Sequence, residues 1–285
     1  MNLDETTVVI RPRQPAEAVD LGYRLVRAWW RPVYAAWLTL ALPLWAIGFL
    51  VGHRMPWLVL LVLWWLRPLA DRAALFVVSH GVFSDFPGWR RTLRSWPGLW
   101  RRQLWATLFL LRLDPARSFH LPVFQLERLS GQQLRTRFKV LNSQGVGQAV
   151  MLTIASAWIE LCLFFAALAF VGMLLPGYGM GDAIGEGFVA LGGGEPQAVA
   201  LLAFAAFTAH ALTAPAWVAG GFTLYLSART RLEGWDVQLA FRRLANRLRQ
   251  SSAAMLVLAL LAAPLFASTL FAIPVHAQEP AAAEE

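Results

Sequence analysis

The sequence is apolar and basic: of its 285 residues 58% are hydrophobic and 15% charged, and the net charge is +8. Soluble domains carry roughly 25% charged residues, so this composition and a mean hydropathy of +0.50 exclude an ordinary soluble domain and indicate a membrane protein. Nucleic-acid binding requires basic residues that share a soluble face. Here they flank apolar runs instead, so no nucleic-acid partner is expected. The single cysteine, Cys162, excludes an intrachain disulfide.

Residues 1–28 are expected to form a cytoplasmic N-terminal arm. The stretch up to about Asp20 is polar and has no periodic apolar face. Pro12 and Pro15 argue against a helix there, because proline lacks the backbone N–H that a helix interior needs. We therefore expect this part of the arm to be loosely ordered.

Residues 29–275 are expected to form an all-α, polytopic membrane domain. A hydrocarbon core is crossed by about 20 apolar helical residues, and five runs meet or approach this length. The predicted spans are 33–51, 56–70, 149–175, 198–227 and 253–275. The acidic tail 276–285 would lie outside. The last apolar run ends like a signal-peptidase site, so a cleaved segment is an alternative to a plain fifth span.

The second span is the shortest and depends on Arg67. The run 56–66 is too short to cross by itself. We expect its helix to continue to Ala70, with the long Arg67 side chain reaching the inner interface. Asp71 follows four residues later and is the expected ion-pair partner of Arg67.

The distribution of basic residues orients the chain. If the N-terminus is inside, every Lys and Arg except Arg54 lies on the cytoplasmic side. The outer loop 176–197 then carries only acidic charges. Basic residues are strongly enriched in cytoplasmic loops, so we expect a protein of the bacterial inner membrane with its N-terminus inside and its C-terminus outside.

Two further segments have the pattern of interfacial amphipathic helices. In the first, 85–113, tryptophans and leucines recur every three to four residues with arginines between them. We expect this helix to break near Pro97 or Gly98 and to lie along the anionic inner leaflet. The second, 232–248, has one apolar side and one basic side. It could rest on anionic lipid or dock a cytoplasmic partner.

Glu160 and His210 are the informative polar residues inside predicted spans three and four, the second of which also contains Tyr225. Each lies near mid-depth in its span, so the two residues would be close together if these spans are adjacent. An ionisable group inside a span costs about 3 kcal/mol or more and normally faces a partner or a cavity. The pair could handle a proton or a ligand, or it could form an interhelical hydrogen bond that fixes the packing.

A second polar group follows span four. Arg229 and Glu233 have the spacing of a helical ion pair, and a lipid phosphate is an alternative partner. The group as a whole, a candidate contact for lipid or a partner protein, comprises Arg229, Arg231, Glu233, Asp236, Arg242, Arg243, Arg247 and Arg249.

Signatures of catalysis are missing from the sequence. The five histidines have no zinc-ligand spacing, and no glycine loop has the phosphate-binding pattern. Asp114 and His120 form a nearby pair, but a pair without a nucleophile does not define a hydrolase. We therefore expect no catalytic residue, metal or cofactor.

Three stretches carry a family resemblance: RPLADRAALFVVSHGVF at 67–83, RSFHLPVFQLE at 117–127 and LYLSARTRLEGWDVQLAFRRLA at 224–245. They resemble uncharacterised bacterial inner-membrane proteins that are encoded near MoxR-type AAA ATPases, von Willebrand factor type A proteins and transglutaminase-like proteins. The last stretch is also similar to the membrane domain of some glycerophosphodiester phosphodiesterases. The resemblance implies membership of a membrane family and a possible ATPase neighbour, and it implies no catalytic residues.

Two functional hypotheses follow. The first is a non-enzymatic scaffold or assembly partner, whose basic segments meet a cytoplasmic ATPase or other soluble protein and whose helices meet other membrane subunits. The second is a transporter or lipid-handling subunit that uses Glu160 and His210. A membrane-embedded enzyme ranks below both, because the sequence has no catalytic set.

Overall fold

The computed structural model describes residues 7–52, 56–83, 86–101, 105–127, 129–174 and 196–235, together with residues 185, 189, 241, 245 and 248. Every regular element in these residues is a helix, which confirms the all-α class. The chain divides into two units, Met1–Asp236 and Val237–Glu285, and the helices below all belong to the first. The predicted fifth span and the outer tail lie outside the described residues.

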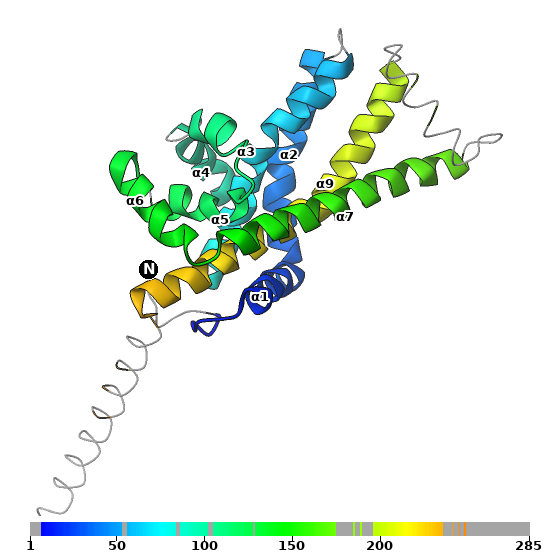
Figure 1. Ribbon diagram of the computed structural model, residues 1–285. Coiled ribbons are helices and arrows are strands. Elements are labelled where there is room, and N and C mark those ends of the chain that lie inside the picture. The colour runs from blue at the N-terminus through cyan, green and yellow to red at the C-terminus, as the bar shows by residue number, and fades with distance from the viewer. Residues whose placement is uncertain are drawn as a thin grey trace, which may run out of the picture. The chain divides into compact units, whose positions relative to one another are not determined.

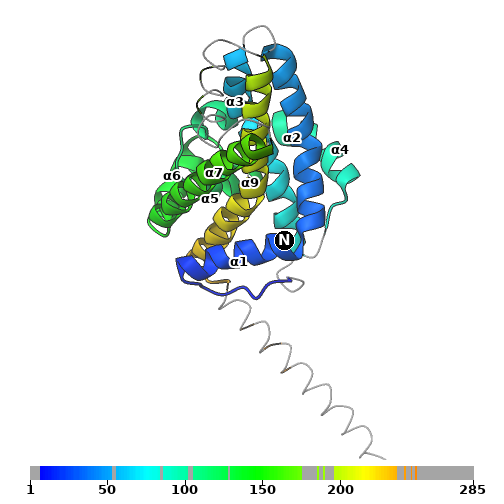
Figure 2. The ribbon, with the colours of Figure 1, turned by 90° about the vertical axis from the view of Figure 1, so that its right-hand side faces the viewer.

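The N-terminal arm contains a helix, α1 (Pro15–Ala28), so the expectation of loose order up to about Asp20 is wrong from Pro15 onward. Pro15 stands at the start of the helix, where its missing N–H is not needed, and it therefore initiates the helix. The buried face of α1 includes Ala18 and Gly22 and packs against α9 (Pro196–Glu233). Figure 2 shows α1 running across the base of the other helices.

Helices α2 (Trp30–Gly52) and α3 (Pro56–Val82) contain the first two predicted spans and lie side by side (Figure 1). The predicted end of the second span at Ala70 is not the end of the helix, which continues to Val82. Asp71 and Arg72 follow the predicted end of the span, and both are buried by protein. Asp71 forms an ion pair with Arg117 of α5.

Helices α7 (Val146–Leu174) and α9 contain predicted spans three and four. Of the described helices, these two are long and apolar enough to cross a membrane, over Val146–Val171 and Val199–Glu233. Only 6% of the most apolar stretch of α7 is buried, whereas the core helix of a soluble protein would be largely covered. This finding covers two helices, so five spans stay a prediction.

The segment between α3 and α7 forms short helices: α4 (Trp89–Arg101), the π-helical turn η2 (Ala106–Leu110), α5 (Arg117–Pro122), a second π-helical turn η3 (Val123–Glu127) and α6 (Gly131–Asn142). The expected break near Pro97 or Gly98 does not occur, because α4 runs through both residues. Pro97 is exposed, so water can bond the backbone groups that proline leaves unpaired.

Helix α9 is the central element, and it packs against α1, α3, α5 and α7. Two close approaches depend on glycine. A Cβ atom on Gly22 of α1 would lie 2.6 Å from the backbone nitrogen of Gly220. One on Gly221 would lie 2.3 Å from the Cβ of Ser118 in α5. The missing side chains let both neighbouring helices reach the α9 backbone.

We expect Gly22→Ala to destabilise the protein by about 1 kcal/mol or more, because the new methyl group would push α1 away from the α9 backbone. The control is Gly147→Ala on α7, where an added Cβ meets nothing within 4 Å. Thermal unfolding of both variants in detergent checks this. Equal melting temperatures for Gly22→Ala and Gly147→Ala would contradict the close packing of α1 on α9.

Candidate functional site

Glu160 on α7 and His210 on α9 lie in direct contact. The Nδ1 atom of His210 is 3.2 Å from Oε2 of Glu160. His210 is almost fully buried, and its ring also lies 5.8 Å, centroid to centroid, from Trp37 of α2. The structure thus brings together the two polar residues that the sequence placed at similar depths in neighbouring spans.

The sequence suggested Asp71 as the ion-pair partner of Arg67, but Arg67 pairs with Glu160 instead. Its Nη1 lies 2.5 Å from Oε1 of Glu160 on α7. Asp71 is fully buried and accepts a hydrogen bond of 2.8 Å from Nη2 of Arg117, at the start of α5. The local i,i+4 partner was the wrong one because tertiary packing brings α7 to Arg67 and α5 to Asp71.

These residues form one connected polar network among apolar helices. Asp71 connects to the network through His210, because its Oδ1 lies 4.0 Å from Nε2 of the imidazole. Helices α3, α5, α7 and α9 each contribute a charged residue or a histidine. Buried ion pairs of this kind fix which surfaces meet, since a mismatched arrangement would leave a charge without a partner.

A polar cavity of about 300 Å³ opens beside the network. It lies between α3, α7, α9 and the segment 112–117 that leads into α5. Its ionisable lining residues are Arg67, Arg112, Asp114, Arg117, Glu160 and His210. Two tryptophans cover the guanidinium groups: Arg112 stacks 3.4 Å from the Trp64 ring centre, and Arg117 lies 4.7 Å from that of Trp217.

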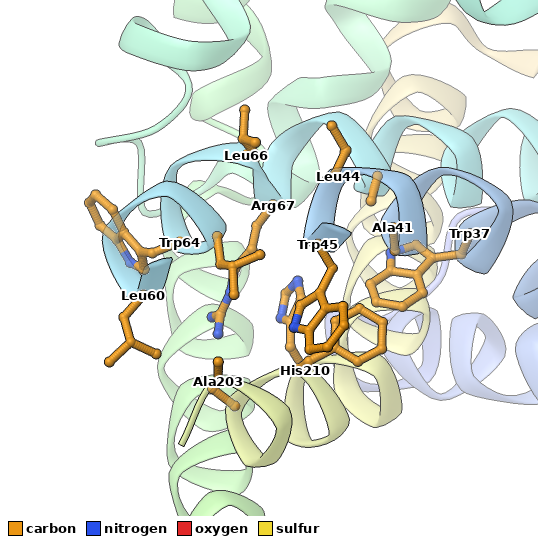
Figure 3. A pocket seen from close by; sticks show the side chains of 14 residues that line it. Trp37, Ala41, Leu44, Trp45, Leu60, Trp64, Leu66, Arg67, Ala203 and His210 are labelled. Carbon is orange, nitrogen blue, oxygen red and sulfur yellow. The ribbon is translucent and has the colours of Figure 1, made fainter. Parts of the chain in front are cut away.

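A smaller, largely apolar pocket of about 60 Å³ lies between α2, α3 and α9. Figure 3 shows Trp45 and His210 close together in this pocket and Arg67 extending into it. Arg67 and His210 line both spaces. Glu160, the third member of the Arg67–Glu160–His210 triad, lines the polar cavity.

The polar group after span four is part of a second network. Arg229 and Glu233 form the expected ion pair, with Nε 2.9 Å from Oε1. Arg137 of α6 joins it, 2.6 Å from Glu233 and 2.8 Å from Glu127. Burial alone would lower the pKa of Arg137, but the hydrogen bonds to the two carboxylates raise it. Arg137 is therefore permanently charged and ties α6 and η3 to the end of α9.

Of the other residues predicted as a lipid or partner contact after span four, one is described by the structure and five are not. Arg231 donates to the main-chain oxygen of Arg13 and so holds the N-terminal arm. Five residues of the group lie outside the described residues: Asp236, Arg242, Arg243, Arg247 and Arg249.

Asp114 and His120, the weak pair noted in the sequence, are in contact, with Oδ2 of Asp114 2.5 Å from Nδ1 of His120. The Nε2 atom of the same ring lies 2.6 Å from Oδ1 of Asn142 in α6. Both ring nitrogens are thus engaged within the protein, and the imidazole links the 112–117 segment to α6. In the part of the chain that the structure describes, no three His, Cys, Asp or Glu side chains gather as metal ligands.

Sequence reasoning missed Arg112 and Arg117 as cavity residues. One signal was available for Arg112, which interrupts the apolar stretch 105–113 as its only charge. An arginine at such a place must reach either solvent or a polar site. Arg117 carried no comparable signal, because its partner Asp71 is 46 residues away in the sequence.

No family model, curated protein or solved structure matches the chain. The resemblance to inner-membrane proteins encoded near MoxR-type ATPases, and to the membrane domain of glycerophosphodiester phosphodiesterases, therefore stays a prediction.

We expect Arg67→Met and Glu160→Gln each to destabilise the protein, because each leaves the partner's charge buried without compensation. The double variant should be less destabilised than the sum of the two single variants, with a coupling free energy of about 0.5–3 kcal/mol. Unfolding of the four proteins in detergent measures it. Strict additivity would show that the two side chains do not interact.

Proposed function

We propose that the chain is a non-enzymatic transport or lipid-handling subunit of the bacterial inner membrane. In this proposal the polar cavity between α3, α7 and α9 receives the polar group of a ligand. The observation that carries it is the Arg67–Glu160–His210 triad at the wall of a 300 Å³ cavity. Ligand sites begin at about this volume.

The size and lining of the cavity support a ligand more than a packing role. One hydrogen bond between Glu160 and His210 would suffice to fix two helices. Here, in addition, Arg67, Arg112 and Arg117 converge on the same space. Placing so many charges among apolar helices costs free energy, and a polar ligand would offset that cost by supplying further contacts.

The surroundings suit an amphiphilic ligand in particular. Next to the cavity, α7 exposes large apolar side chains, with Trp158 64% and Ile154 45% exposed. A molecule with its polar group in the cavity could lay an apolar chain along this surface. The scaffold hypothesis depends on the two basic segments 85–113 and 232–248. Most of the second lies outside the described residues, and the cavity gives the hypothesis no support.

The proposed topology has five spans with the N-terminus inside, and labelling of single cysteines tests it. In a Cys162→Ser background, Gly192→Cys lies in the predicted outer loop and Gln132→Cys in the predicted inner loop. A membrane-impermeant maleimide added to spheroplasts should label Gly192→Cys at once and Gln132→Cys only after permeabilisation. The reverse pattern would contradict the orientation, and equal labelling would contradict a membrane between the two loops.

The ligand proposal is tested by the lipids that co-purify with the protein in mild detergent, measured by native mass spectrometry. We expect wild type to retain lipid and Glu160→Gln to retain several-fold less. Asp20→Asn, at an exposed ion pair with Arg24 on α1, is the control and should behave as wild type. Equal retention in Glu160→Gln, with normal folding by size-exclusion chromatography, would overturn the proposal.

A further inference from the structure

Two buried guanidinium N–H groups without a hydrogen-bond partner belong to arginines that line the polar cavity. They are Nε of Arg112 and Nε of Arg117, and neither has a partner among the described residues. Arg117 as a whole residue is more than nine-tenths buried. Buried N–H groups are nearly always satisfied in native proteins, and each one left unsatisfied costs about 1–3 kcal/mol. Two of them at one cavity indicate a missing acceptor.

Two of the three arginines at the cavity are paired with carboxylates, and the lining carboxylate Asp114 contacts His120 instead of the third. Arg67 has Glu160 and Arg117 has Asp71 as carboxylate partners. Arg112 forms no ion pair with any described residue and is covered by the Trp64 ring. Burial, and then the neighbouring Arg117 and Arg67, lower the pKa of Arg112 to about 10. The guanidinium is still charged at neutral pH, and a bound anion would relieve its unfavourable surroundings.

We infer that this cavity binds a phosphate group through Arg112 and Arg117. The inference rests on the proposed function, because it names the polar group of the ligand in that same cavity. Several donors around one space suit a group with several acceptor oxygens, and guanidinium groups match phosphate geometry through paired hydrogen bonds. The hydroxyls of Ser156 and Thr213 also line the space.

A phosphate group could belong to a lipid headgroup or to a free phosphate, and binding measurements distinguish the two. Delipidated full-length protein in detergent is titrated with dihexanoyl phosphatidic acid, with dihexanoylglycerol and with inorganic phosphate. We expect phosphatidic acid to bind at least about tenfold more tightly than dihexanoylglycerol, which lacks the phosphate. Binding of inorganic phosphate with similar affinity would assign the site to the free anion, and its failure to bind would assign the site to a headgroup. Equal binding of phosphatidic acid and dihexanoylglycerol would overturn the inference.

Variants of Arg112 test the residue assignment. Arg112→Gln should weaken phosphatidic acid binding at least about tenfold, and Arg112→Lys, which keeps the charge but loses the paired geometry, should weaken it less. Arg135→Gln, exposed on α6, is the matched control and should bind as wild type. Wild-type affinity in folded Arg112→Gln would overturn the inference. If Glu160→Gln alone loses its lipid, the proposed function stands and the phosphate assignment fails.

Discussion

Arg67 on α3 and Glu160 on α7 can stay charged between apolar helices because each compensates the other at 2.5 Å. This pair constrains the rest of the unit. Its geometry requires α7 to meet α3 at one level, and His210 then brings α9 to the same point. A rotation or shift of any of the three helices would leave a buried charge without a partner, which is far more unfavourable than the loss of an apolar contact.

Around this point, two glycines allow close packing on α9. Gly22 of α1 and Gly221 of α9 let α1 and α5 approach the α9 backbone, and α5 in turn supplies Arg117 to Asp71. The segment that precedes α5 is held in place by the His120 contacts and carries Arg112 to the cavity wall. The packing that satisfies the charges therefore also creates the polar cavity.

Sequence periodicity and charge were sufficient to predict the all-α class and four of the helices, because long apolar runs have few alternatives to a helix. The proximity of Glu160 and His210 also followed from their depths. The partner of Arg67 was mispredicted, since a local i,i+4 rule cannot detect a residue on another helix. The arm helix was missed because Pro15 was taken as a breaker, although it is favourable at a first helical position.

The claim on which the function depends is that a hydrated polar cavity lies among helices whose outer faces are covered by lipid. The most direct test compares Ser156→Cys, which lines the cavity, with Ile154→Cys on the exposed apolar face of α7, both in a Cys162→Ser background. In membranes, a small water-soluble methanethiosulfonate should modify Ser156→Cys at least about tenfold faster, because only hydrated thiolates react. Faster modification of Ile154→Cys would mean that α7 faces water there, and it would contradict both the membrane setting and the cavity.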